Sequence, residues 1–406
     1  MKYIVIVGDG MADRPLPELG GKTPLQEAST PNMDAMAVAG SPGMVRTIPA
    51  GMHPGSDVAN LSILGYDPDV FYTGRAPLEA ASIGISLSGD DVAFRCNLVT
   101  LRKDDERSSF VMEDYSGGHI STEEAEILIG DLDRKLATNA IRFYSGVSYR
   151  HLMVWSGGSA DVQCVPPHDI IGKVIADYLP VGKGEDVLRK LMSDSVGILA
   201  DHPVNRRRIE EGKGPGNSVW FWGQGVKPSL PTFKGKYLLQ GALISAVDLT
   251  RGLGIYAGFD ILQVPGITGY LDTNYRGKAE AALNALESRD FVYLHVEAPD
   301  EAGHSGNVSD KIRAIEDFDL IVVGTVMKGM ERFGQYRVLL LPDHPTPLKM
   351  RTHTADPVPF VLFDSAKRSR NEGLTFDEAI SGREGILTFE KGHTLMDYFI
   401  RGETPS

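Results

Sequence analysis

Short, largely apolar segments that recur along the chain are the feature that most constrains its fold. The first covers residues 3–7 and is followed by Gly8-Asp9-Gly10, and the others cover residues 219–222, 242–245, 260–264, 291–296, 336–341 and 359–363. Runs of this kind are typical of strands covered on both faces, as in a parallel sheet. Helical patterns at residues 249–257, 277–288 and 309–333 alternate with them. The alternation predicts an α/β fold with a mostly parallel sheet and helices on both faces.

The middle of the chain has a different pattern. Strand patterns at residues 92–101, 109–115, 141–145 and 151–156 follow one another, with one helical pattern at 122–137 that begins with a capping box of Ser121 and Glu124. Strands in runs beside a helix are typical of a separate α+β unit. We therefore predict a core of residues 1–85 and 185–406 and an inserted α+β cap domain of residues 86–184. Residues 185–211 are expected to form one long helix that returns to the core.

Composition excludes several functional classes. The 406 residues carry a formal net charge of −13, which argues against general nucleic-acid binding. No segment reaches the roughly 18 uninterrupted apolar residues of a membrane helix, and the two cysteines, Cys96 and Cys164, argue against a disulfide scaffold. We expect a protein of the reducing cytoplasm. If such an acidic chain binds an anionic substrate, it must gather cations or metals at one site.

Carboxylate and imidazole side chains follow several of the predicted strands. They are Asp9, Asp300, His304, Asp343, His344 and His353. Asp300 and His304 are four residues apart, so on a helical turn they face the same way and can share a metal. Taken singly, each has an ordinary explanation as a turn, cap or surface residue. Together they predict a metal site whose donors suit Mn²⁺, Zn²⁺ or Co²⁺ better than Ca²⁺.

Ser56 is the candidate nucleophile. It follows His53-Pro54-Gly55 and opens an apolar helical stretch. A helix N-terminus offers free backbone N–H groups and partial positive charge, which suit a phosphate. A metal that lowered the pKa of the hydroxyl could make it an attacking alkoxide. The alternative for Ser56 alone is an ordinary N-cap serine.

These segments together resemble the alkaline phosphatase superfamily and, within it, the archaeal-type cofactor-independent phosphoglycerate mutases. The resemblance lies in residues 53–68 (HPGSDVANLSILGYDP), 72–84 (YTGRAPLEAASIG), 201–213 (DHPVNRRRIEEGK), 296–306 (VEAPDEAGHSG) and 341–360. It implies one metal bound by Asp300, His304 and His353. It implies a second metal bound by Asp9, Asp343, His344 and the oxygen of Ser56. Ser56 would accept the phosphoryl group and return it to a different hydroxyl of the same small phosphorylated metabolite.

Candidates for binding that substrate are cationic side chains that we assign to the cap domain and the returning helix. They are Arg75, His119, Arg150, His168, Arg206, Arg208 and Lys213. Arginine suits phosphate and carboxylate because it forms paired hydrogen bonds, and each could instead be a solvated surface charge. We expect Arg150, His168, Arg206 and Arg208 to close over the substrate, bind the glycerate carboxylate and exclude water, so that loss of Arg206 or Arg208 would raise hydrolysis of the phosphoserine.

One segment departs from the archaeal pattern. Residues 113–119 (EDYSGGH) stand where archaeal members have an Asp-Arg-Arg-rich segment, and this version resembles a bacterial branch with a proposed homoserine kinase role. The leading interpretation is transfer between the 2- and 3-hydroxyls of glycerate. The alternatives are phosphoryl transfer to homoserine, phosphomonoester hydrolysis, and metal-dependent phosphate binding without turnover.

Overall fold

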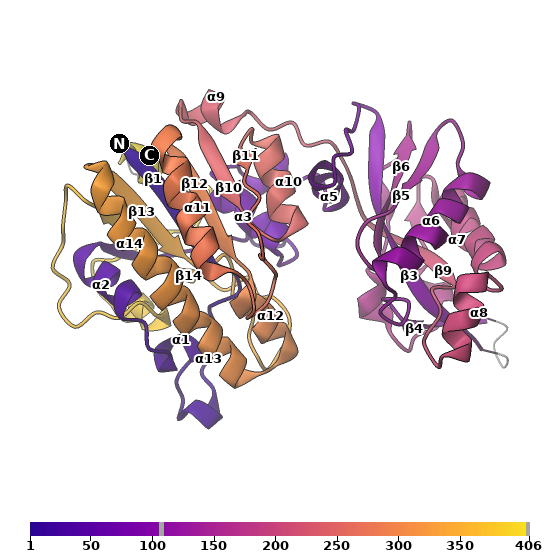
Figure 1. Cartoon of the computed structure of the whole chain (residues 1–406), viewed down its shortest axis with the longest axis horizontal. Helices are drawn as coiled ribbons and strands as arrows, with labels where there is room; N and C mark the ends of the chain where they lie inside the picture. The colour runs from indigo at the N-terminus through magenta and orange to yellow at the C-terminus, as the bar shows by residue number, and fades with distance from the viewer. Residues whose placement is uncertain (105–108, 403–406) are drawn as a thin grey trace. The chain divides into compact units, whose positions relative to one another are not determined.

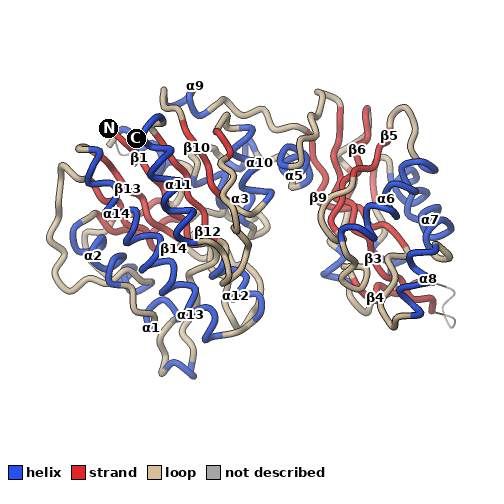
Figure 2. Tube along the Cα trace, viewed as in Figure 1, coloured by secondary structure: helices blue, strands red, loops and turns tan. Residues whose placement is uncertain are grey.

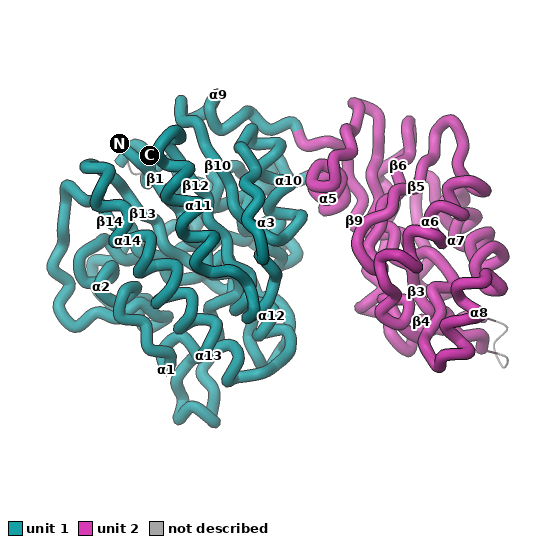
Figure 3. Tube along the Cα trace, in the orientation of Figure 1, with its two compact units in different colours: residues 1–72, 229–406 teal, residues 73–228 magenta. Residues whose placement is uncertain are grey.

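The computed structural model describes residues 1–104 and 109–402, which form two compact units (Figure 3). The first unit is Met1–Tyr72 with Ser229–Ser406, and the second is Thr73–Pro228. The unit boundaries differ from the predicted ones by 13 residues at the first junction, which lies after residue 72 and not after 85, and by 44 at the second, which lies after residue 228 and not after 184. Within the described residues, no helix is long and apolar enough to cross a membrane.

The first unit is built on an eight-stranded sheet of order β11-β10-β12-β1-β13-β14-β2-β15 (Figure 1). Its strands are β1 (Lys2–Gly8), β2 (Ser41–Val45), β10 (Gly241–Ile244), β11 (Asp260–Ile261), β12 (Phe291–Val296), β13 (Tyr336–Leu341), β14 (Val358–Asp364) and β15 (Leu387–Phe389). Only β14 is antiparallel to its neighbours, β13 and β2. The mostly parallel sheet predicted from the sequence is confirmed.

Helices cover both faces of this sheet (Figure 2). They are α1 (Pro24–Glu27), α2 (Pro31–Ala39), α3 (Ser56–Ile63), α4 (Pro68–Phe71), α9 (Phe233–Tyr237), α10 (Asp248–Tyr256), α11 (Tyr275–Ser288), α12 (Ala298–Ser305), α13 (Val308–Asp317), α14 (Gly324–Met330) and α15 (Thr394–Arg401). On one face, Ile4 of β1 packs in a core with side chains of α2, α11, α13 and α14. On the other, the Tyr3 ring lies 5.6 Å from that of Phe399 in α15.

Strand β1 shows why the apolar runs are strands of this kind. Ile4, Val5, Ile6 and Val7 are all fully buried, so neither face of the strand meets solvent. Burying such a side chain stabilises the fold by about 1.5–3 kcal/mol relative to leaving it exposed. The predicted helix at residues 309–333 is also found, as α13, the π-helix η4 (Phe318–Val323), α14 and the 3₁₀ turn η5 (Glu331–Phe333) in succession.

The second unit is an α+β structure with its own core. Its strands are β3 (Asp91–Asp104), β4 (Ser109–Asp114), β5 (Ile141–Tyr144), β6 (Arg150–Ser156), β9 (Ser218–Val226) and the short pair β7 (Val162–Gln163) and β8 (Val181–Gly182). Its helices are α5 (Ala76–Ser82), α6 (Thr122–Leu136), α7 (Glu185–Leu199) and α8 (Pro203–Glu210). The predicted capping box is present at the start of α6, where the Ser121 hydroxyl accepts from the Glu124 N–H.

Two sequence predictions fail in this unit. Residues 185–211 form two helices rather than one, because Pro203 lacks an N–H and forces the preceding His202 out of helical geometry, to ψ 140°. Residues 219–222 belong to β9, which pairs antiparallel with β3 and not with the parallel sheet. Both segments pack in the core of the second unit, and this places the chain boundary after Pro228.

The two ends of the second unit are fastened to each other. The Thr73 hydroxyl donates to the carbonyl oxygen of Val226 at 2.6 Å. Nearby, the two backbone segments approach so closely that a Cβ added at Gly225 would lie 2.0 Å from the Thr73 carbonyl oxygen. Glycine is therefore required at Gly225 by this close approach of the two backbones.

Candidate active site

Three neighbouring parallel strands end at the same edge of the sheet, and one of the predicted carboxylates follows each of them. Strand β1 pairs with β12 on one side and with β13 on the other, in parallel in both cases. Asp9 follows β1, Asp300 lies in α12 directly after β12, and Asp343 follows β13. Ligands in open parallel sheets bind outside the carboxyl ends of the strands. The topology therefore explains why residues so distant in sequence meet here.

Asp300, His304 and His353 form the first group. The Nε2 atom of His304 lies 3.2 Å from Asp300 Oδ2, and that of His353 lies 3.3 Å from Asp300 Oδ1. The two imidazole Nε2 atoms are 2.9 Å apart. Asp300 and His304 are four residues apart on α12, and their side chains face the same way, as expected from the sequence. The three donor atoms face one point and could hold a metal ion.

The second group contains Asp9, Asp343, His344 and Ser56. The Nε2 atom of His344 lies 3.5 Å from Asp9 Oδ1, 3.5 Å from Asp343 Oδ2 and 3.0 Å from the Ser56 hydroxyl. Asp9, Asp343 and His344 are buried, and Ser56 is 9% exposed. The structure thus brings all seven residues that the sequence singled out for metal binding and nucleophilic attack into one unit.

Helix α3 holds Ser56 in place. Ser56 is its first residue, so the backbone N–H groups of the first turn have no partner within the helix. One turn later, the Asn60 amide donates to the Ser56 carbonyl oxygen at 2.7 Å and to Asp343 Oδ2 at 2.8 Å. The Tyr293 hydroxyl in turn donates to Asn60 Oδ1. This network ties the proposed nucleophile to one of the proposed metal ligands.

The electrostatics of the site call for a cation. Burial, with the neighbouring carboxylates of Asp343 and Asp300, raises the pKa of Asp9 well above its ordinary value. Burial also opposes ionisation of Asp343, but the imidazoles of His344 and His295 outweigh it and hold its pKa at about 2. Among the described residues, Asp9 Oδ1 has no hydrogen-bond partner. Clustered buried carboxylates with imidazoles and an unpartnered oxygen fit a divalent metal.

The sequence analysis did not predict a buried polar network that contacts Asp9 of the second group. His295 in β12 lies 3.3 Å from Asp9 Oδ2, and Glu297 follows at the strand end. Glu297 is ion-paired with Lys278 of α11, and all three side chains are essentially inaccessible to solvent. One histidine in an otherwise apolar strand did not disturb the apolar pattern. The signal available was the pair of ionisable residues His295 and Glu297, two positions apart, at the end of a strand pattern that is otherwise apolar.

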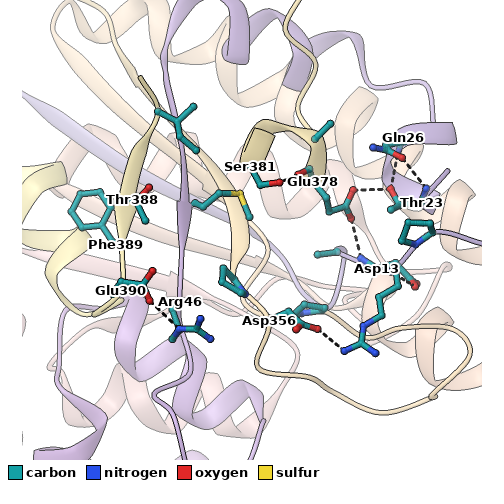
Figure 4. A pocket seen from close by; sticks show the side chains of 18 residues that line it. Asp13, Thr23, Gln26, Arg46, Asp356, Glu378, Ser381, Thr388, Phe389 and Glu390 are labelled. Atoms are coloured by element: carbon teal, nitrogen blue, oxygen red, sulfur yellow. Dashed lines mark hydrogen bonds and ion pairs between the residues drawn. The ribbon is translucent and has the colours of Figure 1, made fainter. Parts of the chain in front are cut away.

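A separate cavity of about 620 Å³ lies on the same unit (Figure 4). It is lined by residues that follow the metal-ligand positions, including Asp13, Pro345 and Asp356, and its lining includes none of the seven site residues. Its charged groups are paired, as in the contact between Arg14 and Asp356. Burial raises the pKa of Glu378 in its wall to about 7, although that carboxyl also accepts hydrogen bonds from within the unit.

In the second unit, two arginines gather around Trp222. The guanidinium carbons of Arg75 and Arg95 lie 5.6 Å and 4.7 Å from its ring, and the His168 ring lies 5.3 Å from it. Glu79 is within 3.2 Å of both arginines. Sequence analysis proposed Arg75 and His168 but missed Arg95, which is 4% exposed and whose Nε has no partner among the described residues. This cluster is the most developed candidate anion site of the unit.

Four other residues proposed to bind the substrate are exposed. Arg150 is exposed and lies over the Tyr149 ring at 5.5 Å. His119 is exposed in a turn with φ of 53°. Arg206 and Lys213 are exposed, and each bonds a neighbour in sequence, the Asp201 carbonyl oxygen and the Glu211 carboxylate respectively. All four remain candidates for contact with a solute.

Arg208 has a different role from the one predicted. Its side chain is 2% exposed, and its donors are used within the protein. The guanidinium donates to the Glu124 carboxylate at 2.6 Å and to the carbonyl oxygens of Gly117, Gly118 and Gly214 at 2.9–3.0 Å. It therefore joins α8 to the start of α6 and to the turn after β4. The expected substrate contact is corrected to a structural one.

Replacing Arg208 by alanine is therefore expected to destabilise the fold and to have no selective effect on substrate retention. Removing one partner of such a buried pair costs about 3 kcal/mol or more, because the other groups stay buried and unpaired. Urea unfolding followed by circular dichroism measures the loss. Arg206→Ala is the matched control and should change the free energy of unfolding by less than about 0.5 kcal/mol. Equal stability of the two variants would contradict this role.

Comparison with known proteins gives a consistent result. The sequence model of the 2,3-bisphosphoglycerate-independent phosphoglycerate mutases matches residues 37–205. A probable mutase of this kind from Geobacter sulfurreducens is 56% identical over 400 residues, which is 98% of this chain and 100% of that protein. One from Methanosarcina acetivorans is 51% identical over 403 residues, covering 99% of this chain and all of that one.

A solved structure agrees with these matches. It is that of a cofactor-independent phosphoglycerate mutase from Thermoplasma acidophilum, with a TM-score of 0.65 and 29% sequence identity. The alignment covers 99% of each chain. The likeness therefore includes both units and is not confined to the sheet that carries the carboxylates.

Proposed function

The chain belongs to the 2,3-bisphosphoglycerate-independent phosphoglycerate mutases, and from this membership we propose that it moves the phosphoryl group between the 2- and 3-hydroxyls of glycerate through Ser56. The observation that supports this most directly is the position of the Ser56 hydroxyl. It lies at the start of α3, is nearly buried, and is 3.0 Å from His344 Nε2. The relatives reported above are named as mutases, so they give the homoserine alternative no support.

The transfer is proposed to occur in two displacements. The Ser56 oxygen attacks phosphorus, an oxygen–phosphorus bond forms, and the bond from phosphorus to the substrate oxygen breaks. The departing oxygen takes up the proton that Ser56 loses, so that glycerate stays in the site with a free hydroxyl. The other hydroxyl of that glycerate then attacks phosphorus, the bond from phosphorus to the Ser56 oxygen breaks, and the proton of the attacking hydroxyl restores the Ser56 hydroxyl. Asn60 restrains Ser56 and Asp343 throughout, because it bonds both. Burial of Ser56 limits the access of water that would hydrolyse the phosphoserine.

Two divalent ions are proposed as cofactors, with Mn²⁺ the first choice and Zn²⁺ or Co²⁺ also suited to the donors. Asp300, His304 and His353 would hold one. Asp9, Asp343, His344 and the Ser56 oxygen would hold the other. When bound, such ions lower the pKa of a hydroxyl and neutralise phosphoryl oxygens.

Cations of the second unit are proposed to bind the substrate carboxylate. Arg75 and Arg95 beside Trp222 are the leading candidates, with His168 and Arg150 next. Arginine pairs with carboxylates through two parallel hydrogen bonds. Arg208 is withdrawn from this role because the protein itself uses its donors.

An isotope-crossover assay tests the proposed route. The enzyme is given a mixture of unlabelled 3-phosphoglycerate and 3-phosphoglycerate labelled in both its carbons and its phosphoryl oxygens, with no bisphosphoglycerate and no ATP. We expect 2-phosphoglycerate in which the two labels stay together, because the phosphoryl group returns to the glycerate that supplied it. Mass spectrometry of the product measures this. Products carrying only one label would contradict retention of the glycerate, and a requirement for ATP would contradict the mutase route.

A further inference from the structure

His295 is a fully buried histidine that contacts two proposed metal ligands without belonging to the proposed set. Its Nε2 atom lies 3.3 Å from Asp9 Oδ2 and 3.9 Å from Asp343 Oδ2. His344 contacts Asp9 through the other carboxylate oxygen, Oδ1. Asp9 is thus flanked by an imidazole at each oxygen, one from β12 and the other from the segment that follows β13.

A polar atom at this point is unsatisfied. His295 Nε2 has no hydrogen-bond partner among the described residues, although it is buried. Leaving such groups buried without partners is costly, and native structures rarely do so. One donor atom each from Asp9, His295 and Asp343 lie within 4.8 Å of one another. An ion among the three would satisfy the histidine nitrogen and both carboxylates.

The opposite side of the ring is fixed by the protein. His295 Nδ1 lies 3.2 Å from Glu297 Oε1, which also accepts from the Ser245 hydroxyl at 2.8 Å and the Ala246 N–H at 2.6 Å. The second oxygen of Glu297 is paired with Lys278. A carboxylate that accepts from Nδ1–H leaves the lone pair of Nε2 directed at the carboxylates of the site. This carboxylate–histidine arrangement is the one that orients histidine ligands of metals.

We propose that His295 is a metal ligand, and that its Nε2 with Asp9 Oδ2 and Asp343 Oδ2 holds a divalent ion at a position additional to the two described above. Glu297 orients the ring, and Lys278 balances the charge of Glu297. The inference rests on the proposed function, because Asp9 and Asp343 are shared with it. It differs from that function in assigning a histidine and an ion that the two-metal arrangement does not need.

Counting bound ions tests the proposal without reference to activity. Wild-type protein and His295→Gln are equilibrated with Mn²⁺, and the ions bound per chain are measured by elemental analysis after dialysis. We expect the variant to bind one ion fewer and to lose one imidazole-nitrogen coupling in the electron spin echo spectrum of bound Mn²⁺. His151→Gln is the matched control, since His151 is equally buried but lies in the second unit. It should bind as many ions as the wild type.

Glu297→Gln provides a second variant that keeps the shape of the orienting side chain. Loss of a residue that orients a histidine ligand weakens metal binding by about 10–100-fold. The affinity of one site for Mn²⁺ should therefore fall by this factor in Glu297→Gln, while the other sites keep their affinity. If His295→Gln and Glu297→Gln both bind the wild-type number of ions with wild-type affinity and unchanged nitrogen coupling, His295 is only a charge partner and the proposal is overturned. A wild-type protein that binds no ion would instead overturn the proposed function.

Discussion

Replacing Ser56 by alanine is expected to lower kcat by at least about 100-fold, a loss of about 3 kcal/mol or more of transition-state stabilisation. The reason is the loss of the attacking oxygen and not of structure, because a methyl group fits where the hydroxymethyl group stood. Among the described residues, the hydroxyl makes one hydrogen bond, to His344. The unfolding transition should therefore change little. Steady-state assay measures the loss of kcat, and urea unfolding followed by circular dichroism measures the stability.

The same helix offers a matched control for this variant. Ser62 lies in α3, is fully buried, and its hydroxyl has no hydrogen-bond partner among the described residues. Ser62→Ala should keep wild-type activity, and its stability should be equal or slightly higher, since an unsatisfied hydroxyl is removed. A Ser56→Ala enzyme with more than about a hundredth of wild-type kcat would exclude Ser56 as the nucleophile.

Removal of divalent metal is expected to abolish the mutase activity, and Mn²⁺, Co²⁺ or Zn²⁺ should restore it. The expectation follows from the proposed ligands, whose carboxylates repel one another when the site is buried and empty of cations. Dialysis against a chelator, elemental analysis and re-addition of each metal provide the measurement. Undiminished activity in protein shown to be free of metal would refute the metal requirement.

The pH dependence of metal binding gives an additional test of the proposed site formed by Asp300, His304 and His353. Burial lowers the pKa of His304, but Asp300 outweighs this effect and raises it to about 9. A metal must displace that proton, so its apparent affinity should increase as pH rises towards 9 and then level off. His304→Ala should remove this dependence and one bound ion. His393→Ala, a histidine of the same unit outside the proposed ligands, should change neither.

The proposed ligands could be found in the sequence because they stand at recognisable places in the fold. Asp9, Asp300 and Asp343 each follow a buried strand, and the parallel arrangement of those strands could be inferred from their apolar runs. His295 was missed because one polar residue inside a strand does not alter the apolar pattern. Its significance depends on which strands are neighbours, and strand pairing between distant segments is not encoded locally.

The errors in the second unit have the same origin. Residues 219–222 have the composition of a parallel strand, yet β9 pairs antiparallel with β3 about 120 residues earlier in the chain. The expectation that Arg208 meets a substrate rests on the paired hydrogen bonds that arginine forms with phosphate and carboxylate. Its burial depends on Glu124 and on three glycine carbonyl oxygens, whose positions only the folded chain reveals.

The fastening of Thr73 to Val226 has an evolutionary consequence. A segment whose entrance and exit adjoin can be exchanged or remodelled as a cassette, because its host needs only to bridge a short gap. All the proposed metal ligands lie outside this cassette, and the arginine cluster lies inside it. If the arginine cluster binds the acid as proposed, selection could alter which acid the protein accepts by changing the cassette alone, while the residues proposed for phosphoryl transfer are inherited unchanged.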